Sequence, residues 1–316
     1  GEGALDFLQT MCTAQINIPI GRIVYTQMLN NKGGIESDLT VSRLGEKSFL
    51  LVVPCATLQR DLSYLNRENN SDKVIIIDTS SAEGVLSIMG PNSRKLLEAV
   101  SPNNFSNLSH PFGTWKNIEI GSGLARAHRV SYVGELGWEI YISSDQCAHV
   151  FEEIWKLQKE FNFNMCGIHA LDSCRIEKAY RHFGHDITDE DHVVDAGLCF
   201  TADLSKTYFK GKEAILKKRK IGSSKKMLQF KLNDPTKMIY HNEPIIRENK
   251  IVGYLTSGNY GHTLGGCVGL GYVDCKDLPD EEILSFEYKV DVAGEIVPAK
   301  TSLRSMYDPR SERVRM

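Results

Sequence analysis

The sequence predicts an α+β fold for residues 1–220 and a small β-barrel for residues 221–316. Strands and helices alternate between residues 37 and 100, which favours helices on one face of a largely antiparallel sheet. Beyond residue 226 the chain has short apolar stretches with turns roughly every 8 to 12 residues, a pattern typical of small barrels. The basic, serine-containing segment Lys217–Lys226 lies between the two parts, and we interpret it as a solvated linker.

Composition and charge exclude several classes of partner. Of the 316 residues, 41% are hydrophobic and 24% are charged, as in ordinary globular proteins. The formal net charge is −3 and no long lysine or arginine block is present, so we expect no nucleic-acid partner. No apolar run approaches the roughly 20 residues that cross a bilayer, so we expect no membrane partner.

Eight cysteines are scattered through the chain without any Cys-x-x-Cys pair. This usage indicates reduced thiols in a bacterial cytoplasm or a mitochondrial matrix. His182 and His185 lie near Asp186, but neither a thiolate nor a third imidazole accompanies them. We therefore interpret them as a structural pair and predict no metal site.

In the first third of the chain, helical spacing alternates with strand-like runs. Leu5, Leu8 and Cys12 recur at helical spacing, and the chain opens directly on this amphipathic helix without an initiator methionine, so we expect a piece of something longer. The predicted elements are a helix at 4–12, a hairpin at 25–41, a strand at 48–53, a helix at 57–65, strands at 74–77 and 84–89, and a helix ending at 100.

The middle of the chain predicts one long strand and two helices. The strand runs from residue 124 to 142, with Gly134 and Gly137 allowing a bend or bulge. An amphipathic helix follows at 147–155, and the next helix points Ile168, Leu171 and Cys174 inward. Residues 181–208 are polar and irregular, and the predicted barrel strands are 227–232, 244–247, 251–257, 268–273, 284–288 and 295–298.

The hairpin at 25–41 carries the first candidate for chemistry. Its turn contains Gly33 and Gly34, and the period of two places Asp38 on the face opposite the one that carries Leu39 and Val41. If Leu39 and Val41 enter the core, Asp38 points at whatever lies opposite the sheet. From spacing alone, the alternative is an ordinary solvated carboxylate near a turn.

Motifs spread over nearly the whole chain resemble the aminomethyltransferase (glycine-cleavage T-protein) family. They occur in the family's order and are Gly33-Gly-Ile-Glu-Ser-Asp-Leu39, Ile88-Met-Gly-Pro-Asn-Ser-Arg94, Tyr132-Val-Gly-Glu-Leu-Gly-Trp-Glu139, Ala170-Leu-Asp-Ser-Cys-Arg-Ile-Glu-Lys178, Phe209-Lys-Gly-Lys-Glu-Ala214 and Ser257-Gly-Asn-Tyr-Gly-His-Thr-Leu264. The resemblance implies three subdomains in a ring around a central folate-binding hole, of which two interleaved α+β subdomains make up residues 1–220.

Within this family the chain is most similar to the C-terminal portion of flavin-dependent dimethylglycine and sarcosine dehydrogenases. The stretches Tyr180-Arg-His-Phe-Gly-His-Asp186 and Tyr307-Asp-Pro-Arg310 carry this closer similarity. The resemblance implies that tetrahydrofolate captures the one-carbon unit released from an N-methyl amine as 5,10-methylenetetrahydrofolate. FAD would then belong to a flavin domain upstream in the same polypeptide.

Carried over residue by residue, the resemblance assigns five site residues. Asp38 matches the family's carboxylate beside N5 and N10, and is the expected catalytic residue. Tyr132 and Glu139 match residues that stack on the pterin and hydrogen-bond to it, while Tyr25 and Arg175 lie near the same ligand. A carboxylate suits the pterin's N–H edge because it can accept two hydrogen bonds.

Two positions depart from the T-protein pattern. Ser37 stands where a second acid is usual, and Leu171 where an arginine is usual. Aminomethyl transfer from a lipoyl protein is therefore not the leading interpretation. The alternatives that stay open are a free-standing aminomethyl- or demethyltransferase using a small one-carbon donor, and a catalytically silent regulatory relative.

Overall fold

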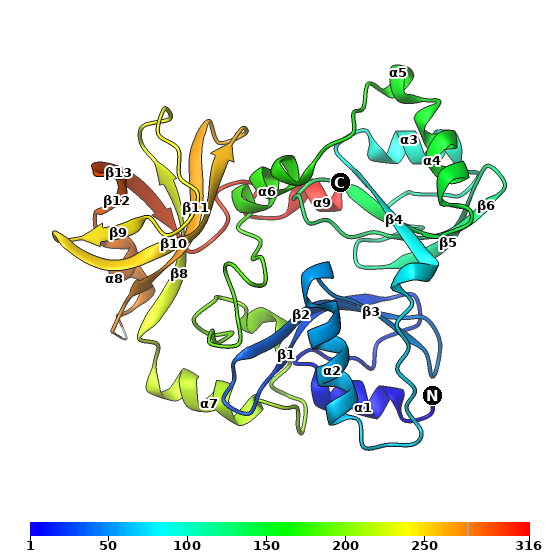
Figure 1. Ribbon diagram of the computed structural model, residues 1–316, viewed down its shortest axis with the longest axis horizontal. Coiled ribbons are helices and arrows are strands. Elements are labelled where there is room, and N and C mark those ends of the chain that lie inside the picture. The colour runs from blue at the N-terminus through cyan, green and yellow to red at the C-terminus, as the bar shows by residue number, and fades with distance from the viewer. Residues whose placement is uncertain (277) are drawn as a thin grey trace.

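The computed structural model describes residues 1–276 and 278–316, which form three lobes, each built on its own sheet (Figure 1). The sheets are a three-stranded sheet in the order β1-β2-β3, a four-stranded sheet in the order β4-β7-β6-β5, and a closed barrel in the order β10-β11-β8-β13-β12-β9. The lobes surround a central region that the loops after α6 (Ile168–Glu177) enter. In the described residues no helix is long and apolar enough to span a membrane.

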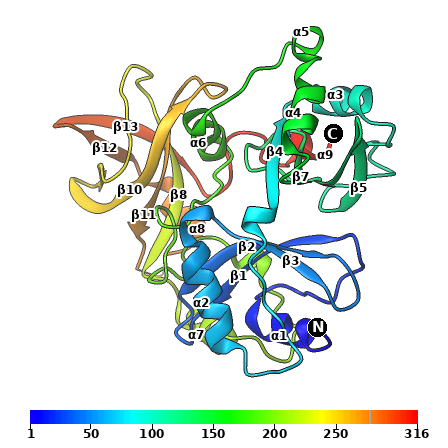
Figure 2. The same ribbon diagram turned by 45° about the vertical axis from the view of Figure 1, so that its right-hand side comes forward.

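The first lobe packs two helices against its antiparallel sheet, as the chain turned by 45° shows (Figure 2). Its elements are α1 (Ala4–Met11), β1 (Ile23–Leu29), β2 (Ile35–Arg43), β3 (Phe49–Val52) and α2 (Leu58–Glu68). Leu39 and Val41 are buried with Leu8 and Leu65, while Asp38 is only partly buried. The predicted hairpin and the orientation of its two faces are therefore confirmed.

The predicted strand at 74–77 is wrong. The segment forms no strand and belongs to no sheet in the structure. Its β-branched composition favours a strand, yet a strand also needs a neighbouring edge to pair with.

The second lobe covers one face of its sheet with two helices. Its elements are β4 (Glu83–Met89), α3 (Ser93–Val100), β5 (Trp115–Ile120), β6 (Gly123–His128), β7 (Gly137–Ser143), α4 (Cys147–Trp155) and the short α5 (Gln158–Phe161). The single strand predicted at 124–142 is in fact β6 and β7, which pair antiparallel. Gly134 has a φ of +77°, so the chain reverses there instead of bending slightly.

Helix α6 turns a polar face inward, contrary to the prediction. Of the three residues predicted to point inward, Ile168 is 67% exposed, and Leu171 and Cys174 are half-buried. The buried residues of the helix are Ser173, Arg175, Ile176 and Glu177. The reason is that α6 contacts the barrel strand β10 (Lys250–Gly261) through hydrogen bonds, including one from the Ser173 hydroxyl to the Tyr260 carbonyl at 2.6 Å. An apolar spacing pattern does not detect a helix that docks through polar groups.

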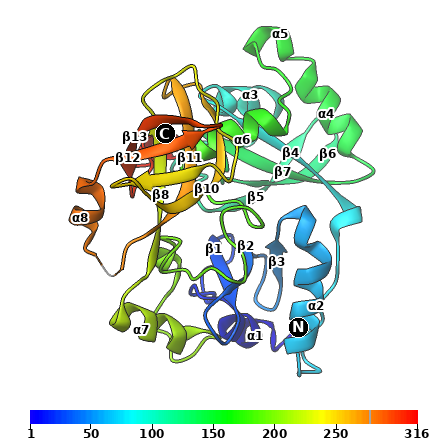
Figure 3. The same cartoon turned by 60° about the vertical axis from the view of Figure 1, so that its left-hand side comes forward.

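The third lobe is the six-stranded closed barrel, which comes forward when the chain is turned by 60° (Figure 3). Its other strands are β8 (Lys225–Leu232), β9 (Pro244–Arg247), β11 (Gly266–Asp274), β12 (Tyr288–Val292) and β13 (Glu295–Ser302), with α8 (Asp280–Ser285) between β11 and β12. Two predictions need correction. The proposed strand at 284–288 contains the end of α8, and Lys217–Lys220 lie in the helix α7 (Lys212–Ile221) and not in a linker.

A C-terminal segment leaves the barrel after β13 and returns to the second lobe, where α9 (Glu312–Arg315) lies (Figure 1). The carbonyl of Met316 accepts hydrogen bonds from Arg94 and Arg129. This segment therefore connects the third lobe to the second. The predicted division into residues 1–220 and 221–316 stays a prediction.

Candidate functional site

The candidate site begins at the hairpin, where β1 and β2 place Gln27 directly opposite Asp38. The Gln27 side-chain amide donates a hydrogen bond to the Asp38 carboxylate at 2.7 Å. Gln27 is fully buried, and its amide oxygen accepts a hydrogen bond from the Thr201 hydroxyl. Because Thr201 engages the oxygen, the amide nitrogen is the group that faces the carboxylate.

Thr201 reaches the hairpin because the segment after α6 packs against it. Leu29 and Ile35, next to the hairpin turn, share a buried cluster with Ile187 and Phe209. Gly33 has a φ of +86°, and a Cβ added there would lie 2.5 Å from the His192 ring. The glycine turn thus provides both the tight reversal and the close approach of the 183–209 segment.

Asp38 is held in an environment that makes it easier to protonate. Burial raises the pKa of Asp38 from 3.8 to about 6, although Gln27, Tyr25 and the charge of Arg181 each lower it. Asp38 as a whole residue is still partly exposed to the solvent. A carboxylate with this pKa is ionised at neutral pH and can accept a proton from a bound substrate.

Aromatic side chains flank Asp38. Burial and the neighbouring Asp38 raise the pKa of Tyr25, and the Tyr25 ring centroid lies 6.4 Å from that of Phe200. Phe200 is 76% exposed, which is unusual for so large an apolar ring. Tyr132 stacks on Tyr180 with centroids 6.1 Å apart, and burial raises the pKa of Tyr132, with smaller contributions from the charges of Asp186 and Asp38. The structure therefore brings Tyr25, Tyr132 and Asp38 to one place.

Glu139 lies farther along, on β7. Its carboxylate accepts a hydrogen bond from the Tyr141 hydroxyl at 2.7 Å, and burial raises the pKa of Glu139. The Tyr141 and His128 rings are tilted by 36° with their centroids 4.2 Å apart, and the His128 ring faces the Ser42 hydroxyl on β2 at 3.5 Å. Ser42 shares the strand face of Asp38, so this row of side chains runs from Glu139 to the sheet face that carries Asp38. Among the described contacts, none joins the two carboxylates directly.

Arg175 is occupied by protein partners. Its guanidinium forms ion pairs with Asp172 at 2.6 Å and with Asp186, and its side chain is 2% exposed. Asp186 also accepts hydrogen bonds from the hydroxyls of Thr256 and Ser257 on β10. Arg175 therefore fastens α6 to the barrel, and a direct contact between Arg175 and folate stays a prediction.

Sequence reasoning missed Gln27, Thr201, Phe200 and Arg181. The hairpin register could have identified Gln27, because a glycine turn between two strands fixes which residues are opposite. The other three lie in the irregular segment 181–208, where no periodic signal indicates which side chains face the hairpin.

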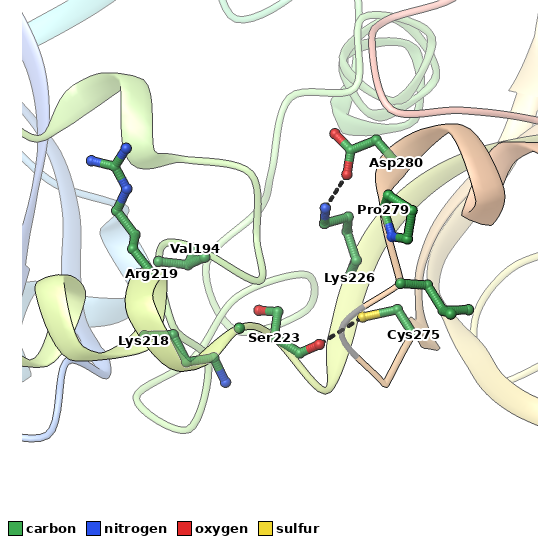
Figure 4. Close-up of a pocket in the computed structure, with 10 residues that line it drawn as sticks. Val194, Lys218, Arg219, Ser223, Lys226, Cys275, Pro279 and Asp280 are labelled. Carbon is green, nitrogen blue, oxygen red and sulfur yellow. Dashed lines mark hydrogen bonds and ion pairs between the residues drawn. The ribbon is translucent and has the colours of Figure 1, made fainter.

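The two described surface pockets lie away from this group of residues. One, of about 340 Å³, lies between α7 and the barrel, where Lys226 pairs with Asp280 and Arg219 extends from the helix (Figure 4). The other, of about 380 Å³, lies beside β9 and β12. No predicted folate residue lines either pocket, so the candidate site is defined by the side chains around Asp38.

Two protein families match the chain. Residues 1–206 match the family described as the GCVT N-terminal domain, and residues 225–308 match the glycine cleavage T-protein C-terminal barrel domain. A crystal structure of glycine cleavage system aminomethyltransferase T from Bartonella henselae superposes with a TM-score of 0.85 at 23% identity, covering 98% of this chain and 82% of that one. This likeness confirms the fold that the resemblance implied.

Three relatives differ in length. The 4-methylaminobutanoate oxidase (formaldehyde-forming) of Paenarthrobacter nicotinovorans is 39% identical over 316 residues, which are 100% of this chain and 38% of the relative. Human mitochondrial sarcosine dehydrogenase is 33% identical, covering 96% of this chain and 35% of the relative. An aminomethyltransferase of Halothermothrix orenii is 33% identical, covering 94% of this chain and 83% of the relative. The chain thus spans little more than a third of the two oxidising enzymes.

Proposed function

Because this chain belongs to the glycine-cleavage T-protein (aminomethyltransferase) family, we propose that it binds tetrahydrofolate and loads a one-carbon unit onto it. The product would be 5,10-methylenetetrahydrofolate, and the one-carbon unit would come from the oxidative demethylation of an N-methyl amine. The observation that carries the proposal is the partly buried Asp38, held by Gln27 and flanked by Tyr25 and Tyr132.

The reaction requires proton transfer but no oxidant. N5 adds to the carbonyl carbon of formaldehyde, the adduct loses water, and N10 closes the ring as it loses its proton. Asp38 is the group that accepts the N10 proton, and its negative charge stabilises the cationic intermediate that precedes ring closure. Proton transfer of this kind typically contributes about 10²- to 10⁴-fold in rate.

The aromatic side chains and Glu139 would bind the ligand. Tyr25, Tyr132 and the exposed ring of Phe200 offer flat apolar surfaces for the pterin and the aryl ring. Glu139 has an acceptor for the N–H edge of the pterin, and its partner Tyr141 would keep the carboxylate oriented. Arg175 would act indirectly, by holding α6 and Asp172 in place.

The amine-oxidising step would take place in a flavin domain upstream in the same polypeptide, which would hold FAD. Two relatives support this: the 4-methylaminobutanoate oxidase is described as formaldehyde-forming, and the sarcosine dehydrogenase acts on an N-methyl amine. This chain matches only 38% and 35% of their lengths, so both contain much additional polypeptide.

A second candidate is a free-standing aminomethyltransferase. The Halothermothrix orenii relative favours it, because this chain covers 83% of that enzyme. The two candidates are distinguished by the reading frame that encodes the chain. A flavin-binding region in frame with Gly1 supports the first, and a nearby initiator codon supports the second.

The folate assignment is tested by titrating the protein with tetrahydrofolate and then measuring methylenetetrahydrofolate formation from formaldehyde. Asp38→Asn should keep the folate affinity within about threefold but slow product formation by roughly 10²-fold or more, because the amide cannot accept the proton. Asp145→Asn, at an exposed turn, is the matched control and should change neither quantity. Absence of folate binding by the native chain, or a normal rate in Asp38→Asn, would refute the assignment.

A further inference from the structure

Arg181 lies beside the candidate site, and the proposed function gives it no task. It follows α6, and its backbone carbonyl accepts a hydrogen bond from the Tyr132 hydroxyl at 2.9 Å. Burial dominates the pKa values of Asp38 and Tyr25, and the charge of Arg181 is among the influences that lower both. The guanidinium is therefore close enough to the proposed reacting groups for its charge to act on them.

The guanidinium of Arg181 is held in a fixed position by the backbone. Its Nε donates a hydrogen bond to the Ala196 carbonyl at 3.0 Å, and its Nη1 donates one to the Ala179 carbonyl at 2.6 Å. Gly197 makes room for the third nitrogen, since a Cβ added at Gly197 would lie 3.0 Å from Nη2. Among the described residues Nη2 has no hydrogen-bond partner, and Arg181 as a whole residue is partly exposed. Part of the guanidinium is therefore accessible to a ligand.

No carboxylate in the described part of the chain forms an ion pair with Arg181. Arg175 differs, because it pairs with Asp172 and Asp186. Asp38 itself accepts its hydrogen bond at 2.7 Å from Gln27. Carbonyl oxygens solvate a guanidinium but leave its charge uncompensated, and a carboxylate matches the geometry of its donors. Arg181 is therefore suited to bind the carboxylate of a ligand.

The charge of Arg181 opposes a reaction that uses formaldehyde alone. The proposed reaction passes through a cationic intermediate close to Asp38, and a second cation nearby destabilises that intermediate. A donor that carries its own carboxylate removes this disadvantage, because the carboxylate compensates the charge of the guanidinium. The carboxylates of folate are less suited to this task, since the whole aminobenzoyl ring separates them from N10.

We propose that Arg181 binds the carboxylate of the one-carbon donor, and that this donor is the N-methylene iminium of an amino acid. The inference rests on the proposed function and names the class of donor for that same site. Arg181 then orients the donor, and its contact with the carboxylate places the methylene carbon next to N5.

The atoms and electrons of this transfer balance without an oxidant. N5 adds to the methylene carbon, and the electron pair of the C=N bond moves onto the amine nitrogen. That nitrogen takes the N5 proton and leaves as a neutral amine with the electrons of the broken C–N bond. N10 then closes the ring, and its proton passes to Asp38 and from there to the released amine. One positive charge is present on the donor iminium and one on the product ammonium.

Two secondary amines that differ in a carboxylate test the proposal. Formaldehyde condenses reversibly with N-methylglycine and with dimethylamine, and only the first adduct carries a carboxylate. With the native protein and tetrahydrofolate, N-methylglycine should raise the rate of methylenetetrahydrofolate formation from formaldehyde by about tenfold or more, after subtraction of the protein-free rate. Dimethylamine should raise it by less than about twofold. Equal stimulation by the two amines, or none by N-methylglycine, would overturn the proposal.

Variants of Arg181 give the second readout, which is the ratio of the rates with and without N-methylglycine in each protein. Arg181→Met should reduce this ratio to below about two, and Arg181→Lys, which keeps the charge but not the planar fork, should give an intermediate ratio. Arg219→Met is the matched control, because Arg219 is exposed on α7, and it should keep the native ratio. A native ratio in Arg181→Met contradicts the proposal. If Arg181→Met does not fold, the ratio in Arg181→Lys and the two amines on the native protein decide.

Binding measurements separate this inference from the proposed function. Tetrahydropteroate lacks the glutamate of tetrahydrofolate. If Arg181→Met weakens the binding of tetrahydrofolate but not of tetrahydropteroate, Arg181 holds a folate carboxylate and the donor assignment is wrong. A native protein that makes methylenetetrahydrofolate from formaldehyde but does not respond to N-methylglycine refutes this inference alone. Absence of tetrahydrofolate binding refutes the proposed function, and this inference with it.

Discussion

Asp38 depends on a neighbour that is itself held in position. The Gln27 amide is fully buried, donates to Asp38, and receives the Thr201 hydroxyl on its other side. A donor to a carboxylate stabilises the ionised form and so lowers the pKa, against the burial that raises it. The basicity of Asp38 is therefore a balance between burial, which raises its pKa, and the Gln27 amide, Tyr25 and Arg181, which lower it, Gln27 most of the three.

Replacing Gln27 by methionine should change the pKa of Asp38 and still fill the space that the Gln27 side chain occupies. Methionine keeps the length of the side chain but cannot donate, so the pKa of Asp38 should rise above about 6. A higher pKa means that, at a given pH, a smaller fraction of Asp38 is ionised. A smaller fraction of the protein then has a base at this position. The acid limb of the rate profile for methylenetetrahydrofolate formation should move to higher pH by roughly one unit.

Thr201 provides the control for this prediction. Thr201→Val should shift the profile in the same direction, because the Gln27 amide loses the hydrogen bond to its oxygen and can rotate its nitrogen away from Asp38. Thr201→Ser keeps a hydroxyl and should show the native profile. A profile unchanged in Gln27→Met would mean that Asp38 is not the group titrating in that limb.

At the scale of elements, α6 attaches to the barrel through buried ionic groups. Arg175 pairs with Asp186, whose side chain is fully buried, and Asp186 is also held by Thr256 and Ser257. Burying a charge is favourable only while its partner and hydrogen bonds are present. Removing only Arg175 or only Asp186 should therefore destabilise the contact between α6 and the barrel more than removing both charges.

Arg175→Met should destabilise the protein by about 3 to 5 kcal/mol, because it leaves Asp186 charged and unpaired in the interior. Combining it with Asp186→Asn should recover part of that loss, since the remaining buried group is neutral. Urea denaturation of the single and double variants measures both values. If the double variant is less stable than Arg175→Met, the two side chains do not act as a pair.

At the scale of the whole molecule, the C-terminal segment links the barrel back to the rest of the chain. Asp308 pairs with Lys178 at 3.0 Å, and the Lys178 side chain is 2% exposed. The Tyr307 hydroxyl donates to Glu135 in the second lobe, and Asn107 donates to the Arg315 carbonyl. The same segment thus touches the end of α6 and the second lobe, and closes the arrangement of three lobes seen in Figure 1.

Asp308→Ala should therefore weaken the contacts that the C-terminal segment makes with the end of α6 and with the second lobe. Its effect should extend beyond a single lobe. It leaves the buried Lys178 ammonium without its carboxylate, at a cost of about 3 kcal/mol. We expect a lower Tm and faster hydrogen exchange both at the end of α6 and around Glu135. Arg310→Ala, at an exposed position in the same segment, is the control and should change little. Faster exchange confined to residues 307–316 would contradict a linking role.

Local patterns by themselves determined the hairpin with its inward and outward faces, most of the helices with apolar stripes, and most barrel strands. They could do so because side-chain alternation and helical spacing depend only on neighbours along the chain. Family motifs, in addition, singled out Asp38, Tyr25 and Tyr132, which the fold brings together.

Only the tertiary structure decided the rest. Thr201 meets Gln27 across 174 residues, and nothing local in an irregular segment predicts that contact. Arg175 forms an ion pair with Asp186, because α6 packs against the barrel through polar groups. The strand predicted at 74–77 has the right residues but no neighbour, since pairing is a property of two segments and a sequence pattern describes only one.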